Sequence, residues 1–351
     1  MSADMKLSVV VPFEDSGRGL ENLAGSLFCR AQGVELLLCG DADENILGRL
    51  RASAGEKNSF VNIPGEPCAA YNEALGRASA PLVMFTSPGV TFAPGAADAI
   101  CGCGGACVCN AAADRDGEPV KLFRDNFSVH EVFNPTVGSN IIMDVGVIRK
   151  NGLLFESADA AGIYAFALKY AAADSFRALH SLLIYNAAPL TADKRSFEII
   201  CNAASEVSEC RKASAVLSAV SLLFWSFGTL PQEEKEQCFD LLRNTARAFL
   251  SDEFCAAYVT AAFGFDAHML KTSCTAGDFL SVGQNVMYRE VTLPILADDV
   301  VRDFYGGKLS FGTLRRSIAA WLYFKLYRMG GPAKKYGCAV CRRFVGGDFS
   351  G

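Results

Sequence analysis

The first forty residues contain two apolar runs that flank one amphipathic segment. The runs cover residues 7–11, closed by Pro12, and residues 34–39. Continuous apolar runs of this length are typical of strands that are buried on both faces of a parallel sheet. Between them, apolar residues recur at helical spacing: Leu20, Leu23, Ala24, Leu27 and Phe28. This order predicts a right-handed strand–helix–strand crossover and therefore an α/β fold.

In an open sheet of this kind, ligands bind at the carboxyl ends of the strands. Those ends are expected at residues 12–15, at the acidic turn 40–45, and at 86–90 after a third apolar run. A helix beginning near Cys68 follows a Pro/Gly turn, and small residues there would let its N-terminus approach an anion such as a diphosphate. A turn of this composition is also compatible with an ordinary loop.

The length and the change of pattern along the chain predict more than one domain. A chain of 351 residues suits about two domains. After residue 200 the apolar spacing becomes helical. We therefore expect an α/β domain over 1–200, a helical extension over 201–303 and a separate tail over 304–351.

The fourteen cysteines do not form a recognisable metal motif. The N-terminus lacks the features of a secretory signal, so a cytoplasmic protein with reduced thiols is expected. The pairs 101/103 and 107/109 have C-x-C rather than C-x-x-C spacing, and the C-x-x-C at 338–341 has no second pair nearby. The sequence therefore predicts no metal site.

The tail is strongly basic. Residues 304–347 contain nine Lys and Arg residues and no Asp or Glu, in a chain whose net charge is −5. A predicted amphipathic helix over 314–329 could lie on anionic lipid through 304–343, placing the protein on the inner face of the membrane. The alternative is a helix packed on the core with a solvated basic face. Nucleic-acid binding is disfavoured because no recognised nucleic-acid-binding fold accompanies the tail.

The order of these segments resembles family 2 glycosyltransferases, which have the GT-A fold. The resemblance is carried by residues 7–12, Ser26-Leu27, 35–45, the segment from Gly65 to Ala74, and 82–94, and it continues more loosely through 151–156 and 166–169. It implies an open, mostly parallel, Rossmann-like sheet with a C-terminal helical extension. It also implies a nucleotide-diphosphate sugar as donor.

Carried over residue by residue, the resemblance implies a set of donor-binding positions. Asp41, or Asp43 with a one-step shift, matches the acidic position that holds the nucleotide's base or ribose, although an aspartate there could also be a turn residue. The loop after the first strand would close over the base. The full set implied by the resemblance is Pro12, Phe13, Glu14, Asp41, Asp43, Ala70, Asn72, Ser87 and Gly89.

The two motifs that carry the family's chemistry are missing. Ser87, Pro88 and Gly89 occupy the Asp-x-Asp positions that would bind a divalent cation, so the usual Mn²⁺ or Mg²⁺ is not predicted here. The leaving group would then need helix N–H groups or a basic side chain such as Lys121, Arg124 or Lys150.

The Glu-Asp base pair is replaced by Gly162 and Ile163. Asp159, one helical turn earlier and assisted by Glu156, is the candidate base, with Asp144 as a further candidate. An exposed or N-capping role for Asp159 is the alternative.

Two functions therefore remain open from the sequence. One is transfer of a sugar from a nucleotide-diphosphate sugar to a glycan or lipid-linked acceptor in cell-surface polysaccharide synthesis. The other is a catalytically inactive, glycosyltransferase-like binding or scaffold protein.

Overall fold

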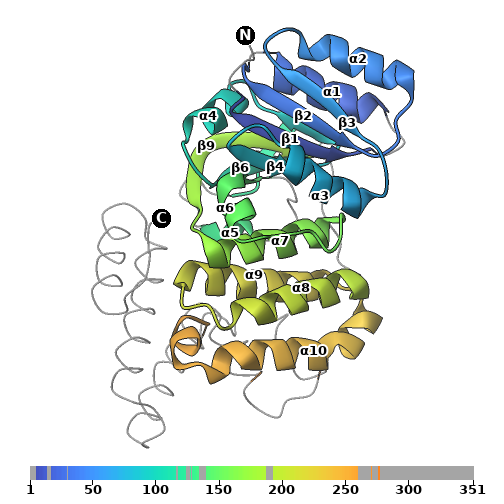
Figure 1. Cartoon of the computed structure of the whole chain (residues 1–351). Coiled ribbons are helices and arrows are strands. Elements are labelled where there is room, and N and C mark those ends of the chain that lie inside the picture. Colours follow the sequence, from blue (N-terminus) through green and yellow to red (C-terminus); the bar gives the residue numbers. More distant parts are fainter. Residues whose placement is uncertain are drawn as a thin grey trace, which may run out of the picture. The chain divides into compact units, whose positions relative to one another are not determined.

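The computed structural model describes residues 5–13, 17–29, 31–115, 118–123, 127, 129–133, 140–186, 193–259, 270 and 276. The chain divides into two compact units, one over Met1–Thr191 and one over Ala192–Ser350 (Figure 1). Glu14, Arg124 and the whole of the basic tail, including 304–343, lie outside the described residues.

The first unit alternates strands and helices along its first hundred residues. In chain order its elements are β1 (Leu7–Pro12), α1 (Gly17–Phe28), β2 (Val34–Cys39), α2 (Glu44–Ala54), β3 (Ser59–Ile63), α3 (Pro67–Arg77), β4 (Leu82–Phe85), β5 (Val90–Phe92), α4 (Ala96–Gly102), β6 (Cys107–Arg115), β7 (Glu118–Lys121), α5 (Val129–Val132), β8 (Ile141–Asp144), α6 (Val145–Lys150), α7 (Ala160–Ala173) and β9 (Arg177–Asn186).

All of these strands belong to one sheet with the order β3-β2-β1-β4-β8-β6-β9-β5, and β7 pairs with β6. Strands β3, β2, β1 and β4 are parallel, in the register Pro12 opposite Cys39 and Val10 opposite Phe85. Strand β8 is antiparallel to both of its neighbours, β4 and β6. The predicted Rossmann-like α/β fold is confirmed, and the sheet is parallel on its β3–β4 side and mixed beyond it.

Every residue of β2 and β4 is buried, because helices cover both faces of the parallel half of the sheet. On one face, α1 and α2 pack over Leu7, Val9 and Val11 in a single apolar cluster. The other face carries an aromatic cluster in which Phe85 of β4 contacts Tyr71 of α3 and Phe166 of α7. Alternate residues of one strand thus serve two cores.

The second unit is helical in the part that the structure describes. It contains α8 (Lys194–Val207), α9 (Ala213–Thr229) and α10 (Gln232–Ser251). Helix α9 is buried along nearly its whole length, and the unit has its own core, which includes Phe197, Leu223, Phe227 and Leu242. Within the described residues, no helix combines the length and apolar character needed to cross a bilayer.

Candidate functional site

The carboxyl ends of β1, β2 and β4 are joined by backbone hydrogen bonds that continue past the strands. Phe13 N donates to Cys39 O at 2.7 Å, Gly40 N donates to Ile63 O at 2.9 Å, and Thr86 N donates to Val10 O at 2.9 Å. The turns at Phe13, Gly40 and Thr86 therefore lie along one edge of the sheet. This is the edge where an open α/β sheet binds its ligands.

Gly40 fixes the contact between the first two turns. Its φ of +126° lies in a region that L side chains rarely adopt, and a Cβ there would come within 3.0 Å of the Phe13 Cβ. The Phe13 ring is half-buried and packs against the core beneath α1. Pro12, at the end of β1, is likewise half-buried. A non-glycine residue at 40 would displace Phe13 from this edge.

The two aspartates after β2 have different environments. Asp43 is the N-cap of α2, and its carboxylate accepts hydrogen bonds from Asn45 N and Ile46 N, both at 2.9 Å. Asp41 is exposed, and no hydrogen bond or ion pair of its side chain is seen within the described part of the chain. Of the two, Asp41 is the carboxylate available to a ligand.

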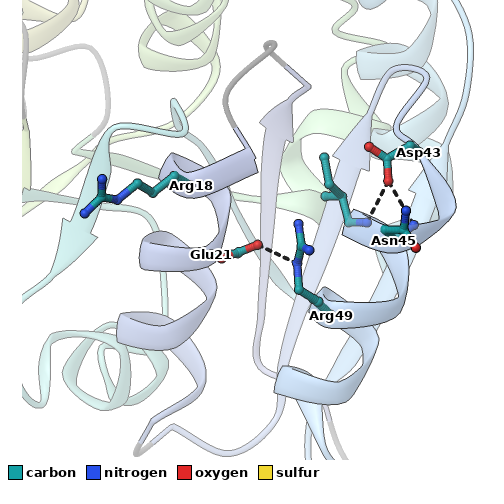
Figure 2. A pocket seen from close by; sticks show the side chains of 6 residues that line it. Arg18, Glu21, Asp43, Asn45 and Arg49 are labelled. Carbon is teal, nitrogen blue, oxygen red and sulfur yellow. Dashed lines mark hydrogen bonds and ion pairs between the residues drawn. The ribbon is translucent and has the colours of Figure 1, made fainter.

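Figure 2 shows an open polar groove beside the first turns of α1 and α2. Arg49 Nε lies 2.6 Å from Glu21 Oε1 in this groove, and Asp43 is held by its capping bonds. Arg18 points away from that ion pair. The cavity volume is about 670 Å³, and its lining residues are Arg18, Glu21, Asp43, Asn45, Ile46 and Arg49.

The N-terminus of α3 is capped by its own chain. Pro67 begins the helix, and the Glu66 carboxylate accepts from Cys68 N and Ala69 N, both at 3.1 Å. These are N–H groups that the sequence analysis assigned to an anionic ligand, and a carboxylate at this position also repels a diphosphate. Ala70 is buried, with 1% of its surface exposed, so its side chain does not reach a ligand.

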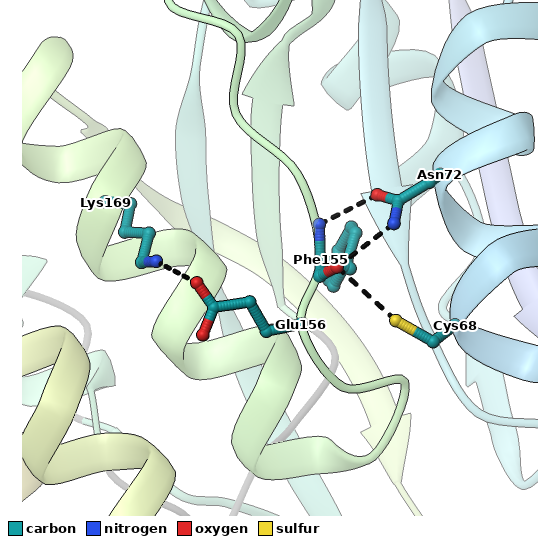
Figure 3. A network of polar contacts seen from close by, with 5 residues as sticks. All are labelled: Cys68, Asn72, Phe155, Glu156 and Lys169. Atoms are coloured by element: carbon teal, nitrogen blue, oxygen red, sulfur yellow. Dashed lines mark hydrogen bonds and ion pairs between the residues drawn. The ribbon is translucent and has the colours of Figure 1, made fainter.

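Asn72 joins α3 to the segment before α7 (Figure 3). Its Nδ2 donates to Phe155 O at 3.0 Å, and Phe155 N donates to its Oδ1 at 2.8 Å. Cys68 Sγ adds a third bond to Phe155 O at 3.4 Å. Both ends of the Asn72 amide are thus occupied by the backbone of one residue, Phe155, which makes Asn72 a clamp between α3 and the segment before α7.

The clamped residue is the centre of an aromatic cluster. The Phe155 ring stacks on Phe166 at 4.1 Å between centroids, and lies 4.4 Å from Phe85 and 5.3 Å from Tyr71. Phe85 immediately precedes the turn at 86–89. The clamp and the cluster together set the position of 151–159 relative to that turn.

The turn after β4 offers no ligand set for a divalent cation. Val90 N donates to Ser87 O at 3.1 Å, Ser87 is half-buried and Gly89 is exposed. Ser87 and Gly89, which the resemblance aligns with two metal-binding carboxylates, offer a neutral hydroxyl and backbone groups, which do not suit a hard dication such as Mn²⁺ or Mg²⁺. Among the described residues, no three His, Cys, Asp or Glu side chains are grouped so that they could hold a metal ion.

Neither of the two positions that the resemblance aligns with the catalytic base pair offers a carboxylate or an open site for one. A Cβ at Gly162 would overlap Ser157 O, and Ile163 is buried. Asp159 is the N-cap of α7 and accepts from Gly162 N at 2.7 Å. Its N-capping role, one of the alternatives in the sequence analysis, is present in the structure.

The other acidic candidates on this side also have partners. Glu156 Oε1 pairs with Lys169 Nζ at 2.6 Å (Figure 3). Asp144 is the N-cap of α6 and accepts from Val147 N at 3.0 Å. Burial, followed by the carboxylates of Glu66, Asp159 and Glu156, raises the pKa of the Cys68 thiol. The hydrogen bond from Cys68 to Phe155 O brings the segment that contains Glu156 to the start of α3.

Sequence reasoning missed the residues that hold these segments in place. Glu66 and Phe155 have no role in the sequence-based site, and Gly162 enters it only as a position where a catalytic carboxylate is missing. Pro67 at the first helical position was a signal for the Glu66 cap, because proline favours that position and an acidic residue suits the preceding cap. Lys121 and Lys150, the described basic candidates, are both exposed.

The sheet order is that of a GT-A-like, Rossmann-like α/β fold. No protein-family model and no curated protein sequence matches the chain. Solved structures of TarS from S. aureus, a GT-A-like glycosyltransferase, do match it. The structure of TarS residues 1–349 is 18% identical, with a TM-score of 0.56 over 76% of this chain and 87% of that chain.

Two TarS complexes give similar values. The complex with UDP-GlcNAc has a TM-score of 0.57 at 16% identity, and the complex with UDP has 0.55 at 17%, with the same coverage of both chains. At sequence identities this low, the structural matches establish a shared fold and nothing further.

Proposed function

We propose that this chain is a glycosyltransferase-like protein of the family 2 type that binds a nucleotide-diphosphate sugar at the carboxyl edge of β1, β2 and β4. The supporting observation is the hydrogen-bonded edge that places Phe13 beside Gly40 and leaves Asp41 exposed. The shared fold adds support, since TarS has been crystallised with UDP-GlcNAc and with UDP. Phe13 would lie against the base, and Asp41 would accept hydrogen bonds from the base or ribose.

Transfer would take place between this edge and the clamped segment 151–159. The acceptor would be a hydroxyl of a glycan or lipid-linked glycan in cell-surface polysaccharide synthesis, with Asp159 or Glu156 as base. Each carboxylate would accept the proton while it is held by its present partner, which is the α7 N-terminus for Asp159 and Lys169 for Glu156. Stabilisation of the leaving diphosphate would come from protein groups and not from a cation, because Ser87 and Gly89 are poor ligands.

A second function, sugar-nucleotide binding without transfer, is favoured by one observation. Of the two positions aligned with the base pair, Gly162 has no room for any side chain and Ile163 is apolar and buried. A protein of this kind would keep the donor site and serve as a binding or scaffold subunit.

Calorimetric titration separates these possibilities. UDP-GlcNAc, UDP and a GDP-sugar are titrated into the full chain in Mn²⁺ and again in EDTA, and donor hydrolysis is then followed over hours. We expect binding that is equal in both buffers. Binding that requires Mn²⁺ would contradict the assignment of residues 87–89, and absence of binding by every nucleotide would refute the donor site. Binding without turnover, with any acceptor supplied, supports the second function.

A matched pair of variants locates the donor site. Asp41→Asn removes the exposed carboxylate and should weaken binding about tenfold, since hydrogen bonds to charged groups contribute roughly 1.5–3 kcal/mol. Asp98→Asn changes an exposed aspartate in the first turn of α4 and should leave binding unchanged. Equal affinities for the two variants would remove Asp41 from the site.

For the basic segment 304–343 we propose contact with anionic membrane on the cytoplasmic face, on the strength of its composition alone. Flotation with vesicles containing phosphatidylglycerol, compared with neutral vesicles, tests this. An unchanged distribution after deletion of 304–351 would refute it.

A further inference from the structure

A group of cysteines at the junction of α4 and β6 has no role in the proposed function. Cys103 follows the last residue of α4, and Cys107 is the first residue of β6. The two sulfur atoms lie 3.5 Å apart, and the Cys103 thiol donates to Gly105 O at 3.0 Å. Cys109 lies two residues further along β6, on the same face of the strand as Cys107. The thiols of Cys103 and Cys107 are therefore in direct contact.

The backbone sets this contact. Gly104 has a φ of +68°, which reverses the chain directly after Cys103. On one side Cys103 N donates to Ile100 O at 3.1 Å, and on the other Arg177 N donates to Ala106 O at 3.0 Å. Because both ends of the turn are anchored, the sulfurs stay near one another. A disulfide bond of about 2.05 Å needs them to approach by a further ~1.5 Å, within reach of side-chain rotation.

Exposure and strand geometry favour one pairing among these cysteines. Cys103 is half-buried and open to a small reagent, whereas Cys107 and Cys109 are fully buried. Cys107 and Cys109 are two residues apart on an extended strand, which separates their Cα atoms by roughly 6.6 Å, near the upper limit for a disulfide. A metal ion is not indicated, because no three ligands in the described residues are grouped to hold one.

We propose that Cys103 and Cys107 are a reversible dithiol–disulfide pair, oxidised by a small disulfide such as glutathione disulfide. The Cys103 thiolate attacks one sulfur of glutathione disulfide, which forms a mixed disulfide and releases one glutathione thiolate. The Cys107 thiolate then attacks the Cys103 sulfur and releases the second. The two protein thiols lose two electrons and two protons, and one glutathione disulfide becomes two glutathione molecules.

The reduced pair is the resting form. The hydrogen bond between Cys103 and Cys107, together with burial, raises the pKa of the Cys103 thiol. Cys103 therefore stays protonated and reacts slowly. Oxidation would tie the end of α4 to the start of β6, a strand that pairs with both β8 and β9. Since α4 follows the 86–89 turn and β5, the bond would restrain the chain just after the donor edge.

Differential alkylation of the full chain tests the pairing. The protein is incubated folded with glutathione disulfide, quenched with acid and unfolded in guanidinium with N-ethylmaleimide. It is then reduced, treated with iodoacetamide and digested with trypsin. A single tryptic peptide, residues 78–115, contains Cys101, Cys103, Cys107 and Cys109, because no Lys or Arg lies between Arg77 and Arg115. Fragment masses show which cysteines were in a disulfide.

We expect iodoacetamide on Cys103 and Cys107 together, and its loss from both when dithiothreitol is added before the quench. Cys103→Ser, and Cys103→Ala as a second variant, should leave Cys107 with N-ethylmaleimide. Cys101→Ser, a matched half-buried control, should keep the pair. Iodoacetamide on any other pair, or on none of the four cysteines, would overturn the proposal. So would a Cys107 that stays protected in both Cys103 variants.

Discussion

Three aspartates that the sequence offered as functional residues are N-caps of helices. Asp43, Asp144 and Asp159 were all candidates for ligand or proton binding, and each accepts hydrogen bonds from the first turn of a helix. In an α/β fold a strand end is followed closely by a helix start, so one aspartate suits both a ligand edge and an N-cap. Spacing along the sequence cannot separate the two roles.

Substitutions at Asp159 can separate them. Asparagine caps a helix about as well as aspartate, whereas alanine cannot cap. Asp159→Ala should therefore lower the free energy of unfolding by about 1 kcal/mol, and Asp159→Asn by much less, in urea titrations. If sugar transfer is detected and Asp159 is its base, Asp159→Asn should abolish transfer while stability is kept. Equal destabilisation by the two substitutions would contradict the capping role.

Asp193, the N-cap of α8, should make the free energy of unfolding depend on pH. Hydrogen bonds from Ser196, including one from its N–H at 2.7 Å, hold the pKa of this carboxyl below its ordinary value of 3.8. A carboxyl whose pKa is lower in the folded state than in the unfolded state stabilises the protein at pH values above its unfolded-state pKa. This stability is lost as the pH falls through the pKa of the folded state.

Asp193→Asn keeps the cap but cannot titrate, so its unfolding free energy should fall less than that of the wild type between about pH 5 and pH 3. Urea titrations at several pH values measure this. Ser196→Ala, which removes one donor, should give an intermediate slope. A slope in Asp193→Asn equal to that of the wild type would show that other carboxylates carry the dependence.

At the scale of elements, the C-terminus of α3 is held by a side chain from another helix. Arg149 of α6 donates through Nη2 to Leu75 O, Gly76 O and Ala78 O at 2.9, 3.1 and 2.8 Å. The last carbonyls of a helix lack partners within it and carry partial negative charge, so a guanidinium there satisfies both needs.

Arg149→Met retains most of the side-chain stem and removes the donors. We expect a loss of about 1–2 kcal/mol in the free energy of unfolding, since three carbonyls would lose a protein partner. Arg149→Lys should recover part of it. Lys150→Met, at the exposed neighbouring position, is the control and should be neutral within about 0.5 kcal/mol. A loss at Lys150 equal to that at Arg149 would indicate a general effect of charge.

The strands and helices that face the core were predictable, and the contacts between distant elements were not. The run at 34–39 and the spacing of Leu20, Leu23 and Leu27 indicated buried elements because burial leaves a periodic pattern in the sequence. The Asn72–Phe155 clamp joins residues 83 positions apart, and nothing local marks either one. Gly162 looked like a lost catalytic residue, whereas its place against Ser157 O makes glycine a packing requirement.

At the scale of the whole molecule, the apolar cluster under α1 and α2 and the helical core of the second unit share no residue among those that the structure describes. Leu36 belongs to the core under α1 and α2 in the first unit, and Leu242 to the helical core of the second. Both side chains are fully buried. We therefore predict that either cluster can lose its packing while the other keeps it.

Hydrogen exchange resolved by mass spectrometry tests this independence. Leu36→Ala should lower the protection of β1, β2 and β4 by about 3 kcal/mol, the usual cost of a cavity of this size, and leave α8–α10 unchanged. Leu242→Ala should do the reverse. Leu154→Ala, at a side chain that is 61% exposed, should affect neither unit. If each core substitution lowered protection equally in both units, the two would unfold together, and a ligand at the edge of β1, β2 and β4 would then stabilise the helical unit by linkage.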